Sequence, residues 1–257
     1  RDVERSRGLG DVYKRQPSDV IIQEDLANTL KKIAKDGPEI FYKGEIANLI
    51  IDFMEKHGGI LKMKDLKGYK PIVINPKPGL YREYEIIYMP RLTAGPLVME
   101  TLNILEGFSL RESGHNTPQT LHLLAEAMAL AYSDYYKYMG DDDYVDVPLN
   151  GLTSKDYAAR LRSRIDLKRA SINVEPGDPW SYESDCTTHL CAADKEGNVV
   201  SATLTLGGAF GSCTMVPETG IILNNQMWGF NPEPGHANSI EPGKKRVAPV
   251  SPIIILK

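Results

Sequence analysis

What this chain of 257 residues contains little of already narrows its function. It holds only three cysteines, an odd number without the spacing of a zinc site or a disulfide framework, so we interpret Cys186, Cys191 and Cys213 as free thiols. No apolar run approaches the roughly 20 residues of a membrane-spanning helix, so we expect no membrane span. Basic residues number 30 against 34 acidic ones, and the net charge of −4 argues against a nucleic-acid partner.

The rest of the composition is that of a globular protein. Hydrophobic residues make up 42% of the chain and charged residues 25%, which is the usual balance of a packed domain. With membrane and nucleic acid set aside, we expect a small molecule or a peptide as the substrate. Nothing in the composition calls for a cofactor.

The two ends of the sequence differ from the rest of the chain. Residues 1–16, RDVERSRGLGDVYKRQ, show no periodicity and resemble translated adaptor sequence, so we interpret them as a sequencing artefact, with a basic arm as the alternative. Residues 251–257 predict an apolar strand at the other end. We expect a fragment of a longer protein, and the compartment stays open between periplasmic or secreted and cytoplasmic.

The first two thirds of the chain favour helices. Apolar spacing predicts a helix over residues 23–36 with Leu26, Leu30 and Ile33 on its buried face, and a second over 43–57. An alternating aromatic and β-branched run predicts a strand over residues 81–89. Two more helices are expected over residues 97–106 and 118–139. The second of these is predicted to bury Leu121, Leu124, Ala125, Met128 and Ala131.

Two polar groups in this part invite a metal hypothesis. His122 and Glu126 lie four residues apart on one predicted helix, a spacing that can share an ion, but no third ligand follows at a convincing distance. Residues 141–143, Asp-Asp-Asp, lack the other ligands of a calcium loop. We therefore predict no metal site and interpret residues 141–143 as a solvated turn.

Residues 185–227, DCTTHLCAADKEGNVVSATLTLGGAFGSCTMVPETGIILNNQM, predict a hairpin. Asp194 and Asn198 flank a three-residue loop in which Gly197 supplies the left-handed backbone that such loops require. If these two flanking residues pair, counting back along both strands sets Thr187 opposite Thr205. Their Cβ atoms would then lie roughly 5 Å apart on one face. Such pairs are also ordinary strand neighbours, so the geometry alone leaves a structural role open.

The same stretch resembles the gamma-glutamyltranspeptidase family. The resemblance rests on Thr187-Thr188-His189, Asp194-Lys195-Glu196-Gly197-Asn198, Val200-Ser201, Thr203, Thr205-Leu206 and Gly220-Ile221-Ile222-Leu223-Asn224-Asn225-Gln226-Met227. Members are N-terminal-nucleophile hydrolases, whose precursor cuts its own chain and exposes a threonine. The resemblance implies cleavage between Cys186 and Thr187, and Thr187 as the nucleophile. Residues 171–186, rich in proline and small or acidic residues, would form the flexible leader before the cut.

An N-terminal threonine carries its own base, because a free α-amine titrates near 7.7 to 8.0 and can accept the hydroxyl proton. No Ser-His-Asp triad is then needed, and the five histidines are expected to be scattered without partners. The resemblance implies that Thr205 orients the nucleophile and that Asn225, Gln226 and the position of Gly207 bind substrate.

Several positions depart from the family pattern. The family has Asn at the position of Gly207, an acid at that of Gly229 and a Ser-Ser pair at that of Ala248-Pro249, and these groups clamp the γ-glutamyl substrate. Each lost contact with a charged group removes about 1.5 to 3 kcal/mol. We therefore predict retained self-cleavage with an altered acyl donor.

The interpretation as a whole is an α/β (α+β) protein carrying part of the αββα sandwich of N-terminal-nucleophile hydrolases. Residues 17–186 would belong to the large subunit and residues 187–257 to the start of the small subunit. The expected activity is gamma-glutamyltransferase or glutathione-hydrolase-like transfer of an acyl group from an amide to water or an amine. The alternatives are a non-glutamyl amide acylase and a catalytically silent binding homologue.

Overall fold

The computed structural model describes residues 20–76, 78–172, 174 and 187–257, with the side chains of residues 187 and 188 left aside. The chain forms two compact units. Of the described residues, the first unit takes 20–74, 187 and 205–226, and the second takes 75, 76, 78–172, 174, 188–204 and 227–257. The expected artefact at residues 1–16 and the expected leader that ends at Cys186 lie outside the described residues, apart from residues 171, 172 and 174.

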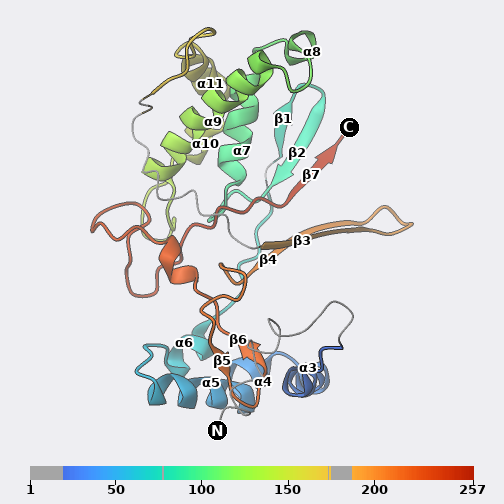
Figure 1. The fold of residues 1–257 in the computed structure, drawn as a ribbon, viewed down its shortest axis with the longest axis vertical. Helices are drawn as coiled ribbons and strands as arrows, with labels where there is room; N and C mark the ends of the chain where they lie inside the picture. The colour runs from blue at the N-terminus through green and yellow to red at the C-terminus, as the bar shows by residue number, and fades with distance from the viewer. Residues whose placement is uncertain (1–19, 77, 173, 175–186) are drawn as a thin grey trace. The chain divides into compact units, whose positions relative to one another are not determined.

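The first unit packs short helices against a two-stranded ladder (Figure 1). Its elements are α3 (Glu24–Asp36), α4 (Glu39–Tyr42), α5 (Glu45–Lys56), α6 (Met63–Gly68), β5 (Met215–Val216) and β6 (Ile221–Ile222). Ile46 and Ile50 on α5 are buried against Val216 of β5. A segment near the start of the described chain is thereby joined to one about 170 residues later, just before the Asn-Asn-Gln sequence.

The two helices predicted in this unit are confirmed, and the buried face expected for α3 is confirmed in part, because Leu26 and Ile33 are half-buried and Ile33 packs against the core. Leu30 is 58% exposed, and the buried residue is its neighbour Thr29. The hydroxyl of Thr29 donates a hydrogen bond to the carbonyl oxygen of Thr219 at 2.8 Å. A polar residue therefore takes the inner position of α3, because the neighbouring loop offers it a main-chain acceptor.

The second unit contains a three-stranded antiparallel sheet and a group of helices (Figure 1). The sheet has the order β1 (Gly79–Tyr81), β2 (Tyr84–Tyr88), β7 (Ile253–Leu256). The helices are α7 (Gly95–Leu105), α8 (Leu110–Ser113), α9 (Pro118–Tyr138), α10 (Leu149–Leu152) and α11 (Lys155–Arg162). The strand predicted over residues 81–89 is confirmed for residues 84–88 as β2, whereas Tyr81 ends β1 and residues 82 and 83 form the turn between the two strands. The apolar strand at the chain's end is confirmed as β7, which pairs with β2.

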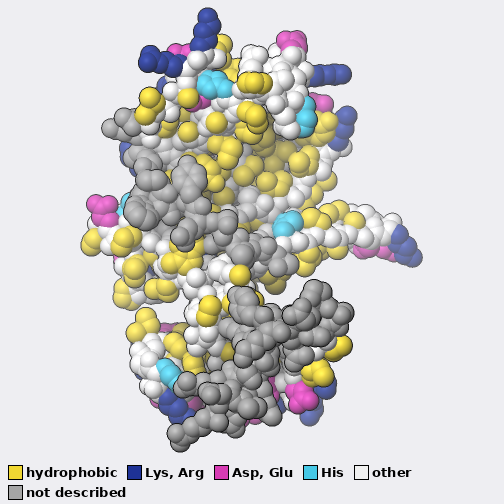
Figure 2. Space-filling model, in the orientation of Figure 1, with side chains coloured by type: hydrophobic (Ala, Val, Ile, Leu, Met, Phe, Trp, Pro, Cys, Tyr) yellow, Lys and Arg dark blue, Asp and Glu magenta, His cyan; other side chains and the backbone are white. Residues whose placement is uncertain are grey.

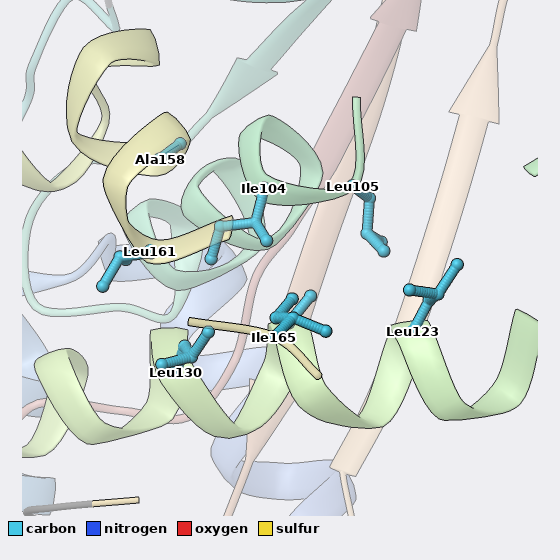
Figure 3. Packing of buried hydrophobic residues seen from close by; sticks show 8 residues of the cluster. Ile104, Leu105, Leu123, Leu130, Ala158, Leu161 and Ile165 are labelled. Carbon is cyan, nitrogen blue, oxygen red and sulfur yellow. The ribbon is translucent and has the colours of Figure 1, made fainter. Parts of the chain in front are cut away.

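The helical core of this unit forms where α7, α9 and α11 meet (Figure 3). Ile104 comes from α7, Leu123 and Leu130 from α9, and Leu161 from α11. The face predicted for α9 is wrong, because the buried side chains include those of Leu123, Ala127 and Leu130. Only Ala131 of the five predicted residues is buried, while Leu121, Leu124, Ala125 and Met128 are exposed. The helical period was read correctly, but apolar residues lie on more than one side of α9 and only its neighbours select the buried one.

The polar groups considered for metal binding have other partners. A ring nitrogen of His122 lies 2.7 Å from the carbonyl oxygen of Asp166, and the buried Glu126 carboxylate accepts hydrogen bonds from the main chain and hydroxyl of Ser171. Asp141 corrects the expectation of a solvated turn, because its side chain is fully buried and accepts the main-chain N–H of Lys245 at 2.8 Å. Among the described residues, no helix has the length and apolar character needed to cross a membrane.

Candidate active site

The predicted hairpin is present as strands β3 (Thr187–Ala193) and β4 (Val199–Thr205). Asp194 and Asn198 close it: the N–H of Asp194 donates to the carbonyl oxygen of Asn198 at 3.1 Å, and the Asp194 carboxylate accepts the main-chain N–H of Asn198 at 2.9 Å. Hydrogen bonds from Asn198 lower the pKa of the Asp194 carboxyl. Gly197 adopts a φ of 87°, the left-handed backbone expected of it. Figure 2 shows hydrophobic side chains along the hairpin and charged ones at its tip.

The register of the hairpin agrees with the sequence-based expectation. His189 and Thr203 face each other across the strands, with the imidazole Nδ1 atom 2.8 Å from the hydroxyl oxygen. Both strands have seven residues, and the pairing fixed at the loop and at His189 sets residue 187 opposite residue 205. The backbone of Thr187 thus begins β3 where β4 ends. Its side chain, and Cys186 before it, lie outside the described residues.

The hydroxyl oxygen of Thr205 is where three of the predicted site residues meet. The main-chain N–H of Gly207 donates to it at 3.0 Å, and the side-chain amide nitrogen of Gln226 lies 3.5 Å from it. Gly207 adopts a φ of 95°, which lets the chain turn back onto the threonine directly after β4. A partly buried hydroxyl is therefore held by a main-chain donor and faced by an amide.

Asn225 is close by, and its side chain binds the main chain. Its side-chain oxygen accepts the main-chain N–H of Gly208 at 2.9 Å, and its own N–H donates to the carbonyl oxygen of Leu206 at 3.0 Å. Asn224 in turn accepts the N–H of Gln226 at 2.9 Å. Asn225 therefore ties the segment after β4 to the Asn-Asn-Gln segment, which positions Gln226. Direct contact of Asn225 with substrate stays a prediction.

Arg246 is a residue that sequence reasoning missed. Gln226 begins the 3-10 turn η2 (Gln226–Gly229), and Gly229 ends it. A Cβ atom added to Gly229 would lie only 2.4 Å from the guanidinium Nη1 of Arg246. The arginine therefore fills the space of a side chain at residue 229. No sequence signal connects two residues this far apart, and only the folded backbone brings them together.

The expectation of histidines without partners is also corrected. His189 bonds Thr203, and the Nδ1 atom of His236 accepts the N–H of Asn238 at 3.1 Å. In the described part of the chain, no group of three or more His, Cys, Asp or Glu residues is placed to hold a metal ion.

Comparison with known proteins places this geometry in context. The Gamma-glutamyltranspeptidase family profile matches residues 10–257. The chain is 39% identical over 252 residues to the glutathione hydrolase proenzyme of Escherichia coli K12, covering 93% of this chain and 43% of that protein. It is 40% identical over 248 residues to the acylase ACY 1 proenzyme of Pseudomonas sp. strain SE83, covering 94% and 43%.

Solved structures agree. Cephalosporin acylase from Bacillus halodurans superposes with a TM-score of 0.85 at 34% identity, covering 96% of this chain and 44% of that one. Helicobacter pylori gamma-glutamyltranspeptidase superposes with a TM-score of 0.61 at 32% identity, covering 71% and 57%. The expected α+β fold of N-terminal-nucleophile hydrolases, present in part, is confirmed. The chain spans less than half the length of the two curated relatives named above.

Proposed function

Because the chain belongs to the gamma-glutamyltranspeptidase family, we propose that it carries the nucleophile of a self-cleaving amide hydrolase or acyltransferase. The observation that carries the proposal is the Thr205 hydroxyl. It lies at the end of β4, opposite the backbone of Thr187, and is held by Gly207 and faced by Gln226. A threonine hydroxyl at this place can both accept a hydrogen bond from and donate one to a second hydroxyl on the facing strand.

The first reaction is cleavage of the chain. The hydroxyl oxygen of Thr187 attacks the carbonyl carbon of Cys186, the amide nitrogen of Thr187 leaves and takes up a proton, and an ester joins the two parts. The α-amine of Thr187 is free from this point, and water then hydrolyses the ester to give the carboxylate of Cys186 and the free hydroxyl of Thr187. Residues 17–186 become the end of a large subunit and residues 187–257 the start of a small one, so the two subunits of one precursor are each other's partners.

The second reaction is turnover of an amide. The freed α-amine accepts the hydroxyl proton of Thr187, directly or through one water, and the hydroxyl attacks the substrate carbonyl. The amine of the substrate leaves, and water or another amine resolves the acyl-enzyme. Thr205 orients the nucleophile, and Gln226, whose side-chain oxygen is buried without a hydrogen-bond partner among the described residues, is available to a substrate donor.

The acyl donor is proposed to differ from a γ-glutamyl group. Where the family resemblance implies an acid, Gly229 stands, and the guanidinium of Arg246 fills the space of its missing side chain. The family resemblance implies that the side chain at residue 229 meets the donor, and a cationic group at that position would disfavour the ammonium of a γ-glutamyl donor and favour a donor without it. This favours the second candidate, an acylase for a non-glutamyl amide, and the acylase relative at 40% identity supports the same assignment.

Self-cleavage tests the nucleophile. A precursor containing these residues is expected to give two chains on a denaturing gel, with Thr187 as the new amino terminus by mass spectrometry. Thr187→Ala should give an intact chain, whereas Thr188→Ala, the neighbouring threonine, should still be cut. A wild-type precursor that stays intact would favour the silent homologue instead, and cleavage of Thr187→Ala at the same bond would overturn the nucleophile assignment.

A matched pair of substrates tests the acyl donor. N-Glutaryl-p-nitroanilide differs from γ-glutamyl-p-nitroanilide only by lacking the α-ammonium group. The cleaved enzyme is expected to have the higher kcat/KM for the glutaryl compound. Arg246→Gln should lower this preference on the order of tenfold, as expected for one interaction with a charged group, and Arg246→Lys should retain part of it. Equal preference in wild type and Arg246→Gln would contradict a role for Arg246.

A further inference from the structure

A second cluster of reactive side chains lies along the hairpin, on the strand face that carries His189. The sulfur atom of Cys191 is 3.3 Å from Nε2 of His189, and Nδ1 of the same ring is 2.8 Å from the hydroxyl oxygen of Thr203. Residues 189 and 191 share one face of β3 because side chains alternate along a strand. Thr203 reaches that face from β4. A thiol, an imidazole and a hydroxyl thus form a continuous chain of contacts.

The contacts define which nitrogen can act as a base. When Nδ1–H donates to the Thr203 hydroxyl oxygen, the lone pair of Nε2 faces the thiol of Cys191. The hydroxyl of Ser201 also approaches Nε2, but at 3.5 Å, the longest of the three contacts. The arrangement is a nucleophile, a base and a group that orients the base, the order seen wherever a side chain is activated for attack.

We propose that Cys191 is a modification site for soft carbon electrophiles, with His189 as its base and Thr203 as the residue that positions His189. As the sulfur forms a bond to the electrophilic carbon, the thiol proton passes to Nε2 of His189 and then to solvent. The leaving group departs with the electrons of its former bond. Cys191 and His189 are both exposed in this chain of 257 residues, so a small electrophile can reach the sulfur here. This reaction does not depend on the proposed amide chemistry at Thr187.

The chain contains its own reference thiol. Cys213 is also free and exposed, but its thiol has no side-chain hydrogen bond among the described residues. It lies in the loop before β5, held through its main-chain N–H to Phe210 at 2.8 Å. The comparison of Cys191 with Cys213 in one molecule therefore separates activation by histidine from simple exposure.

Competitive alkylation with iodoacetamide at neutral pH tests the proposal. The folded chain is treated with a limiting amount of reagent, digested with trypsin and analysed by mass spectrometry, with fragment ions separating Cys191 from Cys186, which share one tryptic peptide. Cys191 is expected to react on the order of tenfold faster than Cys213. His189→Gln should bring Cys191 down to the rate of Cys213 and leave Cys213 unchanged, which also shows that the fold is kept.

Thr203 is tested by rescue. Thr203→Val removes the hydroxyl at nearly constant volume and should slow Cys191 several-fold, whereas Thr203→Ser keeps the hydroxyl and should restore the rate. Ser201→Ala serves as the matched control and should leave the rate within about twofold. Equal rates for Cys191 and Cys213 in the wild-type chain, or an unchanged Cys191 rate in His189→Gln, would overturn the proposal.

Discussion

The carboxyl groups of Glu100 on α7 and Asp134 on α9 lie close enough to interact inside the second unit. Both side chains are buried, and the hydroxyl of Tyr157 donates to Asp134 at 2.5 Å. Burial, followed by the negative charge of Asp134, raises the pKa of the Glu100 carboxyl to about 10. Glu100 therefore holds a proton at neutral pH.

The proton held by the buried Glu100 carboxyl makes the stability of the second unit fall with rising pH. An unfolded glutamate has a pKa of 4.5, and folding raises that of Glu100, so the folded state binds more protons between pH 4.5 and about 10. The free energy of unfolding should fall across this window, by at most about 1.4 kcal/mol per pH unit from this group. Urea titrations at several pH values, followed by circular dichroism, measure the slope.

Glu100→Gln isolates the contribution of this carboxyl group to the pH dependence of the free energy of unfolding. The amide keeps the shape and can donate to Asp134, but it does not titrate, so the slope across the window should be shallower than in the wild type. Glu112→Gln, an exposed residue on α8, should leave the slope unchanged. A wild-type slope retained in Glu100→Gln would mean that another group causes it.

Two adjacent leucines on α9 test which face of the helix is buried. Leu123 is 2% exposed and packs with Ile104 and Ile165, whereas Leu124 is 39% exposed. Leu123→Ala should lower the free energy of unfolding by about 2 to 5 kcal/mol, because it removes buried methyl groups and leaves a cavity. Leu124→Ala should cost less than about 1 kcal/mol. Comparable losses in both variants would restore the face predicted from the sequence.

Asp141 provides a similar contrast with its neighbour. Its fully buried carboxylate accepts the N–H groups of Asp143 and Lys245 and lies 3.9 Å from the Lys245 ammonium. Asp141→Ala should destabilise the second unit by about 2 to 4 kcal/mol, since it leaves buried donors without an acceptor. Asp142 is exposed and pairs with Arg91, so Asp142→Ala should cost at most about 1 kcal/mol. Thermal and urea unfolding of the two variants give the comparison.

Local patterns predicted the elements but not their partners. The helical period predicted α5 and α9, and the loop chemistry of Asp194, Gly197 and Asn198 predicted the hairpin and its register, because such signals lie within a few residues of the structure they determine. The buried face predicted for α9 was wrong and that for α3 was confirmed only in part, since the side that a helix buries depends on elements distant in the sequence. Thr29 is buried because a main-chain acceptor, the Thr219 carbonyl, lies nearby only in the folded chain.

In the candidate site, too, residues with a local sequence signal were predicted and contacts between distant residues were not. The family resemblance directed attention to Thr205, Gly207 and Gln226, and the structure brings these three together. Arg246 could not be predicted, because its link to Gly229 runs across a loop that carries no pattern of its own. Asn225 was assigned to substrate, while its side-chain oxygen binds the main chain of Gly208.

Gly220, which precedes β6, lies against the start of α3. It adopts a φ of 65°, and a Cβ atom there would lie 2.6 Å from the main-chain nitrogen of Leu26 at the start of α3. Gly58 after α5 has a similar φ of 72° but nothing within 4 Å of its added Cβ. Alanine at either position costs about 1 kcal/mol because the backbone there is left-handed. Only the methyl group of Gly220→Ala also clashes with the main chain, at Leu26.

We therefore expect Gly58→Ala to lower the free energy of unfolding by about 1 kcal/mol and Gly220→Ala by about 3 kcal/mol or more, because backbone on both sides must move. The strand after Gly220 leads directly to Gln226, so the displacement should also shift the amide away from Thr205. In a precursor, Gly220→Ala should slow cleavage before Thr187 while Gly58→Ala leaves it unchanged. Equal stability losses in the two variants would show that α3 moves to accommodate the added methyl group. Unchanged cleavage in Gly220→Ala would show that the rate of cleavage does not depend on the position of Gln226.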